Sequence, residues 1–126
     1  MKITLSIIVA IIFIALAMFI PAGSSPDVGD GNNISVVDGK QVISINAKGG
    51  FSPRVTNAKA DIPTEIRMRT QGTFDCSSTL SIPSLDYFEN LPSSGETIIN
   101  IPPQKVGTKL DGLCAMGMYN FEINFD

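Results

Sequence analysis

The sulfur-containing side chains near the end of this chain are the residues whose type and spacing could do chemistry. Cys114, Met116 and Met118 alternate over five residues, and the chain has one other cysteine, Cys76. Thiolates and thioethers are soft donors, and soft donors select Cu(I) over Zn²⁺, Fe²⁺ or Mg²⁺. The sequence therefore offers Cys76, Cys114, Met116 and Met118 as candidate metal ligands, with Cu(I) as the metal that suits them.

The absence of histidine from the sequence excludes most catalytic alternatives. A Ser-His-Asp triad, a Cys-His pair and an imidazole zinc site all need a histidine side chain. No base is placed to activate a serine such as Ser77 or Ser78. Asp75, beside Cys76, is expected to cap a turn, since aspartate readily bonds its own backbone there. We therefore expect that this chain is not an enzyme.

The first twenty residues differ in composition from the rest of the chain. Residues 3–20 are apolar except for Thr4 and Ser6, and Lys2 is the one cation before them. The stretch is just long enough to span a bilayer, while the small residues Ala22 and Ser24 would also permit signal cleavage. The sequence predicts a transmembrane anchor or a signal helix over 1–20. Either one places the rest of the chain outside the cytoplasm, in the periplasm or at the cell exterior, and cleavage would make it secreted.

Residues 21–33 predict a flexible linker, because they are glycine, proline, serine, aspartate and asparagine with one alanine and one valine. Residues 34–126 are enough chain for one domain with its own core. The net charge of the whole chain is −3 and its basic residues are scattered. Nucleic acid is therefore not an expected partner.

Short alternating segments separated by glycine and proline fill the domain. Asp38-Gly39 is a hairpin dipeptide between residues 34–37 and 41–47. Residues 64–70 alternate strictly, with Ile66 and Met68 on the face expected to enter the core. Further strands are expected over 54–58, 79–82, 97–101, 108–114 and 118–125, and a loop over 85–91. The pattern predicts an all-β fold of seven to eight strands in an antiparallel sandwich.

The order of several motifs resembles that of the cupredoxin-like domains of bacterial envelope metal-handling proteins. The motifs are Gly50-Phe51-Ser52-Pro53, Ile82-Pro83, Ile99-Asn100-Ile101-Pro102 and the Cys-x-Met-x-Met segment from Cys114 to Met118. The resemblance implies a Greek-key β-sandwich with a metal at one end. It implies that Cys76 is the mid-chain ligand and that Cys114, Met116 and Met118 lie on the ligand loop. Blue-copper centres use two histidines, so blue-copper electron transfer is not expected.

Two functions remain open. The first is a membrane-tethered, extracytoplasmic domain that binds Cu(I) for copper buffering, sensing or transfer, with the membrane and a copper transporter or chaperone as partners. The alternative is a structural or interaction module in which Cys76 and Cys114 form a disulfide that closes a loop of about 39 residues. Both functions require the two cysteines to lie together, so their redox state distinguishes them.

Overall fold

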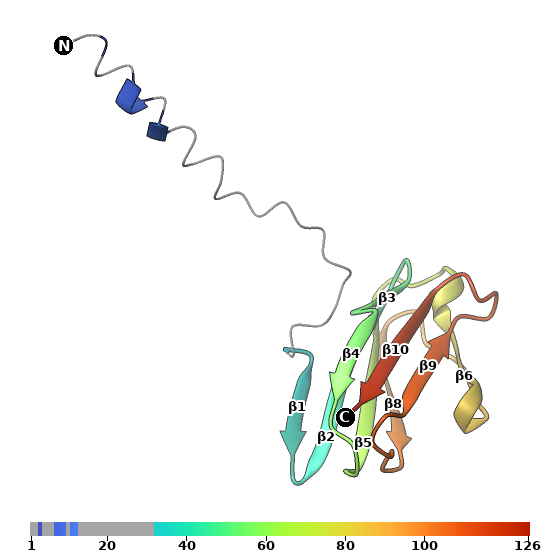
Figure 1. Ribbon diagram of the computed structural model, residues 1–126. Coiled ribbons are helices and arrows are strands. Elements are labelled where there is room, and N and C mark those ends of the chain that lie inside the picture. The colour runs from blue at the N-terminus through green and yellow to red at the C-terminus, as the bar shows by residue number, and fades with distance from the viewer. Residues whose placement is uncertain (1–2, 4–6, 10, 13–31) are drawn as a thin grey trace.

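The computed structural model describes residues 3, 7–9, 11–12 and 32–126, and residues 32–126 form a β-sandwich (Figure 1). The first sheet contains β1 (Ile34–Val37), β2 (Lys40–Ala47), β3 (Phe51–Ser52), β5 (Thr64–Thr70) and β8 (Gly95–Ile101). The second sheet contains β4 (Val55–Ala58), β6 (Thr79–Ile82), β7 (Tyr87–Asn90), β9 (Lys109–Leu113) and β10 (Asn120–Phe125). Two short 3₁₀ turns, η1 (Cys76–Ser78) and η2 (Pro83–Leu85), flank β6. The prediction of an all-β sandwich is confirmed, but residues 32–126 form ten strands instead of the seven to eight expected.

Two strand pairs correct the prediction that the sandwich is antiparallel throughout. β2 runs parallel to β5, and β4 runs parallel to β10, while the other paired strands are antiparallel. After β2 the chain crosses into the second sheet as β4, which runs in the opposite direction. It then re-enters the first sheet as β5 beside the start of β2. This crossing, rather than a hairpin, makes the β2–β5 pair parallel.

Most strand positions agree with the predicted segments. The β1–β2 hairpin turns at Asp38 and Gly39, whose φ angles are 53° and 75°. Positive φ at both central residues is what a two-residue hairpin of this kind requires. The prediction of a loop over 85–91 is wrong, because residues 87–90 form β7 at the edge of the second sheet. Three of its four residues are exposed, so no alternation of apolar and polar residues marks this strand in the sequence.

The core lies between the two sheets and follows the two-residue period of the strands. Ile66 and Met68 are fully buried, which confirms their predicted place in the core. Phe121 packs its ring edge-to-face against Phe51, with the centroids 5.2 Å apart. This contact joins β10 to β3 across the sandwich. This contact therefore anchors the start of β10 to the first sheet, next to the loop that connects β9 and β10.

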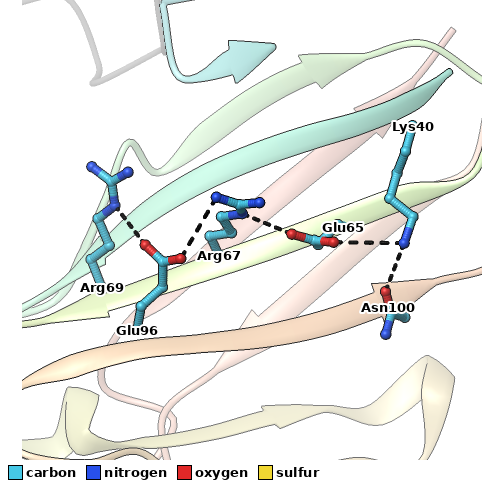
Figure 2. A network of polar contacts seen from close by, with 6 residues as sticks. All are labelled: Lys40, Glu65, Arg67, Arg69, Glu96 and Asn100. Atoms are coloured by element: carbon cyan, nitrogen blue, oxygen red, sulfur yellow. Dashed lines mark hydrogen bonds and ion pairs between the residues drawn. The ribbon is translucent and has the colours of Figure 1, made fainter. Parts of the chain in front are cut away.

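The outer face of the first sheet carries a network of charged side chains (Figure 2). Arg67 Nε donates to Glu65 at 2.7 Å, and Arg69 Nε donates to Glu96 at 3.2 Å. The full network consists of Lys40, Glu65, Arg67, Arg69, Glu96 and Asn100. Arg67 and Arg69 thus face out of the sheet, on the side opposite to Ile66 and Met68. The network lies across β2, β5 and β8, and it includes none of the four candidate metal ligands.

The predicted anchor over 1–20 and linker over 21–33 lie almost entirely outside the described residues. Within the described part of the chain, no helix is long and apolar enough to cross a membrane. The anchor, its cleavage and the linker stay predictions.

Candidate metal centre

Three loops meet at one end of the sandwich, and we call this end the sulfur end. They are residues 48–50 after β2, residues 71–78 between β5 and β6, and residues 114–119 between β9 and β10. Figure 1 shows this end at the top of the view, where β3 lies and where the chain turns from β9 into β10. β2 and β5 end there, and β6 and β10 begin there. The strand directions therefore bring together loops that are far apart in the sequence.

The two cysteines lie together at the sulfur end, as the sequence predicted. Cys76 begins η1, and Cys114 directly follows β9. They are joined as a disulfide, with their Cα atoms 5.6 Å apart. Cys114 is 2% exposed, whereas Cys76 is only partly buried. In this oxidised form neither sulfur is a thiolate, so a metal could be held by both only after the disulfide is reduced.

Hydrogen bonds close the loop that carries Cys114 and both methionines. Gly117 N donates to the carbonyl oxygen of Cys114 at 2.9 Å, and Cys114 N donates to Tyr119 O at 3.0 Å. Gly117 has a φ of 67°, a conformation that glycine adopts without strain. Tyr119 N also donates to Cys114 Sγ at 3.3 Å. The tight turn therefore fixes the backbone on both sides of the methionines and directs an N–H donor at the buried sulfur.

Asp75 holds the loop of Cys76, and the prediction that it caps a turn is confirmed. Its carboxylate accepts from Ser77 N at 2.8 Å and from the Ser77 hydroxyl. It also accepts from Gly49 N at 2.8 Å, which ties the loop after β2 to the loop of Cys76. These donors, the Ser77 hydroxyl above all, hold the pKa of Asp75 below its ordinary value.

Thr79 connects the two cysteine loops directly, and the sequence analysis missed this role. Its hydroxyl donates to the carbonyl oxygen of Cys76 at 3.0 Å and accepts from Ala115 N at 3.0 Å. The Thr79 hydroxyl oxygen thus contacts both cysteine loops, and Ala115 is 36 positions away in the sequence. Nothing in the local sequence signals the contact, because a threonine that starts a strand is ordinary.

Met116 and Met118 lie outside the core. Met116 is 80% exposed and Met118 is 65% exposed. This exposure excludes a place in the core for either side chain. Phe74, two residues before Cys76, is also strongly exposed. The sulfur end therefore presents two thioethers and one aromatic ring to solvent around the cysteine pair.

The donor chemistry of this end suits a soft metal ion. Among the described residues, no group of three or more histidine, cysteine, aspartate or glutamate side chains could hold a metal ion. The donors that remain are the two cysteine sulfur atoms and the two exposed thioethers on the loop of Cys114. Such donors suit Cu(I) and do not suit Mg²⁺ or Ca²⁺, which need oxygen ligands. By donor type, Cys76, Cys114, Met116 and Met118 would suit a Cu(I) ion once the two cysteines are reduced.

Comparisons with known proteins agree with the fold. A family model described as "Cupredoxin-like domain" matches residues 8–122. The metal-binding domain of the Cu(I)-exporting P-type ATPase CopA of Streptococcus pneumoniae, solved with Cu(I), is similar with a TM-score of 0.69 and 21% identity. The similarity covers 82% of this chain and 99% of that one. A copper-binding protein solved in its apo form by NMR is similar with a TM-score of 0.68 and 20% identity, over 82% and 100% of the two chains. A comparison with proteins of curated function found no match.

Proposed function

The chain belongs to the family of cupredoxin-like domains, and we propose that it handles copper by binding Cu(I) through reduced Cys76 and Cys114. One observation carries this proposal. Two cysteines from distant parts of the sequence lie with their Cα atoms 5.6 Å apart, beside the loop of two exposed methionines. The names of the similar structures, one of them solved with Cu(I), support copper as the metal.

The roles of the four residues follow from their chemistry. Bound Cu(I) would be held mainly by the thiolates of Cys76 and Cys114, because thiolates carry charge and the metal displaces their protons. The N–H of Tyr119 would offset part of the cost of burying the Cys114 thiolate. Met116 or Met118 would add a neutral thioether from the solvent side. Exposed thioethers also give a partner protein access to the ion, which suits buffering or transfer.

The location and the partner are also part of the proposal. We place the domain outside the cytoplasm, tethered to the membrane by residues 1–20 or secreted after their removal. A copper transporter is the proposed partner, since one of the similar structures is a domain of a copper-exporting ATPase. The role is binding rather than catalysis or blue-copper electron transfer, because the chain contains no histidine. If the domain stays tethered, protease added outside spheroplasts is expected to remove residues 34–126, and protection from it would contradict this orientation.

A second candidate function rests on the disulfide itself. In the oxidised form the domain would be a structural or interaction module, stabilised by the Cys76–Cys114 bond and free of metal. Fold membership does not decide between the two, since one fold serves many functions.

Copper titration of the two redox forms tests the proposal. The full chain, reduced and kept without oxygen, should bind one Cu(I) in competition with a chelator of known affinity, whereas the oxidised chain should bind none. A mass measurement that shows loss of two hydrogens identifies the oxidised form. If the reduced chain fails to compete for Cu(I), the second function is the correct one.

A further inference from the structure

A pocket of about 370 Å³ opens beside the loop of the methionines, and neither cysteine lines it. Its walls include Gly49, Gly50, Arg54, Met118, Tyr119 and Asn120. Met118 is thus shared between the pocket and the candidate copper ligands. A molecule that brings an ion to the copper site can therefore place a second functional group in this pocket.

Arg54 supplies the charge of this pocket. Its guanidinium donates to Asn120 Oδ1 at 3.1 Å, and it takes part in none of the ion pairs found between described residues. Its backbone carbonyl accepts from Glu122 N at 2.8 Å, which fixes the residue against β10. A guanidinium has five N–H donors in a planar fork that matches a carboxylate. The pocket therefore offers an oriented cation that lacks an acidic partner among the described residues.

Tyr119 links this pocket to the cysteines. A Cβ atom placed on Gly50 would lie 3.4 Å from Cδ1 of the Tyr119 ring, so the ring packs directly over this glycine. The backbone N–H of the same tyrosine donates to Cys114 Sγ. One residue therefore forms a wall of the pocket with its side chain and contacts the candidate copper ligand with its backbone.

We propose that this pocket binds the carboxylate of a low-molecular-weight thiol that delivers Cu(I) to the domain, with Arg54 as the carboxylate-binding residue. The inference rests on the proposed copper function and adds the class of molecule from which the ion comes. A ligand that reaches both the copper site and the pocket needs a sulfur atom to hold the ion and an anionic group to bind Arg54. A carboxylate-bearing thiol is the simplest molecule that combines the two.

The transfer is a ligand exchange without oxidation or reduction. A Cu(I) ion held by two thiolates of the carrier passes to the thiolates of Cys76 and Cys114. The two protons released by the protein thiols go to the two carrier thiolates, which leave as free thiols. Copper stays Cu(I) throughout, so the exchange itself needs no oxidant or reductant. The protein thiols that it uses come from reduction of the Cys76–Cys114 disulfide by two further thiol molecules, which leave joined as a disulfide.

Two carriers of nearly equal size test the role of the carboxylate. Cu(I) is offered to the reduced full chain as its complex with mercaptopropionate or with mercaptopropanol, which has a hydroxyl in place of the carboxylate. Transfer is followed by separating the protein from the carrier at set times and measuring the copper that the protein holds. A pair between an exposed arginine such as Arg54 and a carboxylate is worth up to about 1 kcal/mol, which corresponds to about fivefold. We expect the carboxylate carrier to load the wild-type chain about fivefold faster at low carrier concentration.

Three variants locate the effect. Arg54→Gln should remove the preference for mercaptopropionate, and Arg54→Lys should retain part of it. Lys48→Gln removes another cation of the sulfur end, one that lines a different pocket, and should keep the preference. Equal rates for the two carriers in the wild-type chain, or an unchanged preference in Arg54→Gln, would overturn the inference. Failure of every carrier to load the chain would instead contradict the copper function itself.

Binding without copper provides a separate readout. The methyl thioether of mercaptopropionate keeps the carboxylate and cannot exchange thiols. Added to the metal-free chain, it should shift the NMR signals of Tyr119 and Asn120, and the same concentration should shift them much less in Arg54→Gln. Shifts of equal size in Arg54→Gln, or no shift in the wild-type chain, would contradict a carboxylate site at Arg54.

Discussion

Cys114 and Cys76 have different surroundings, although a single bond joins them. Cys114 is almost completely buried and accepts a hydrogen bond from Tyr119 N, while Cys76 is partly exposed at the first position of η1. After reduction, the buried sulfur would hold an ion from within the protein, and the more accessible sulfur would meet it first. We therefore expect the four sulfur residues to contribute unequally to copper affinity.

Replacing Cys114 should weaken copper binding far more than replacing Met116. Loss of a residue that only supports a metal ligand commonly costs about 10- to 100-fold in affinity, so Cys114→Ser should cost more than about 100-fold. Met116→Leu removes a neutral donor and should cost about tenfold or less. Chelator competition on the reduced variants measures both. Met68→Leu is the control, because Met68 is fully buried in the core and its replacement should leave the affinity unchanged.

Asp75 should make the stability of the sulfur end dependent on pH. Its pKa is lowered, first by the Ser77 hydroxyl and then by the backbone N–H groups of Gly49 and Ser77. A lowered pKa stabilises the fold above the unfolded-state value of about 4, and this contribution is lost as the pH falls through the folded-state pKa. Asp75→Ala should therefore destabilise the protein by about 1 kcal/mol at neutral pH, as loss of a cap does.

Urea unfolding of the wild type and of Asp75→Ala at several pH values tests this expectation. The difference between the two proteins should shrink as the pH falls below about 4. A difference that stays constant from neutral to acidic pH would show that the carboxylate charge has no such role.

The β9–β10 hairpin is the element that positions the loop of Cys114, Met116 and Met118. Phe121 of β10 lies opposite Gly112 of β9 in the antiparallel register. A Cβ atom on Gly112 would overlap the ring of Phe121, because the ring lies directly over the glycine. The absence of a side chain at residue 112 therefore allows the aromatic ring to fill this part of the core.

A side chain at position 112 should destabilise the hairpin. Gly112→Ala should lower the free energy of unfolding by roughly 1–3 kcal/mol, the usual cost of overpacking a core. Denaturant unfolding of the oxidised chain measures the loss. Asp111→Ala, on the exposed side of the same strand, is the control and should stay within about 0.5 kcal/mol of wild type. Recovery of stability in the double variant Gly112→Ala/Phe121→Leu would attribute the loss to the ring.

The elements also show what the sequence could and could not predict. β5 was predicted with its bounds because both sheet faces leave an alternating pattern at residues 64–70. β7 was missed because an exposed edge strand leaves no such pattern. The parallel β2–β5 pair depends on how the chain crosses between sheets, which no local residue records. The family resemblance anticipated that Cys76 and Cys114 lie together, but neither their oxidation nor the bridge through Thr79 has a local signal.

At the scale of the whole molecule, the disulfide joins the two ends of a long segment that passes through both sheets. Cys76 lies just before β6 and Cys114 just after β9, and these strands are neighbours in the second sheet. The two cysteines are 38 positions apart, and the enclosed segment includes β7 and β8. Such a bond restricts the unfolded chain strongly, so its loss should affect the entire domain.

Reduction should therefore lower global stability, and Cu(I) should restore much of it. The loop length corresponds to about 3–4 kcal/mol in the chain-entropy model. Free Cu(I) at about 100 times its dissociation constant should return about 2.7 kcal/mol to the reduced chain, if the unfolded chain does not bind it. Chemical unfolding of the oxidised, reduced and copper-loaded chains measures the three stabilities.

The double variant Cys76→Ala/Cys114→Ala is the control for this comparison. Its stability should respond neither to a reducing agent nor to Cu(I). A stabilising effect of Cu(I) on the double variant as large as that on the reduced wild type would place the ion elsewhere in the molecule.

The last strand carries the chain from the sulfur end to the opposite end of the sandwich. β10 begins at Asn120, and Asp126 N donates to Ala58 O at 3.0 Å, at the far end of β4 (Figure 1). A flexible linker attached after Asp126 would therefore leave the molecule on the side away from the cysteines. Molecules fixed to a biosensor chip through such a linker would all present Met116, Met118 and Arg54 to the flowing solution. Attachment there lets carriers and partner proteins be assayed on one oriented layer without blocking the end that they must reach.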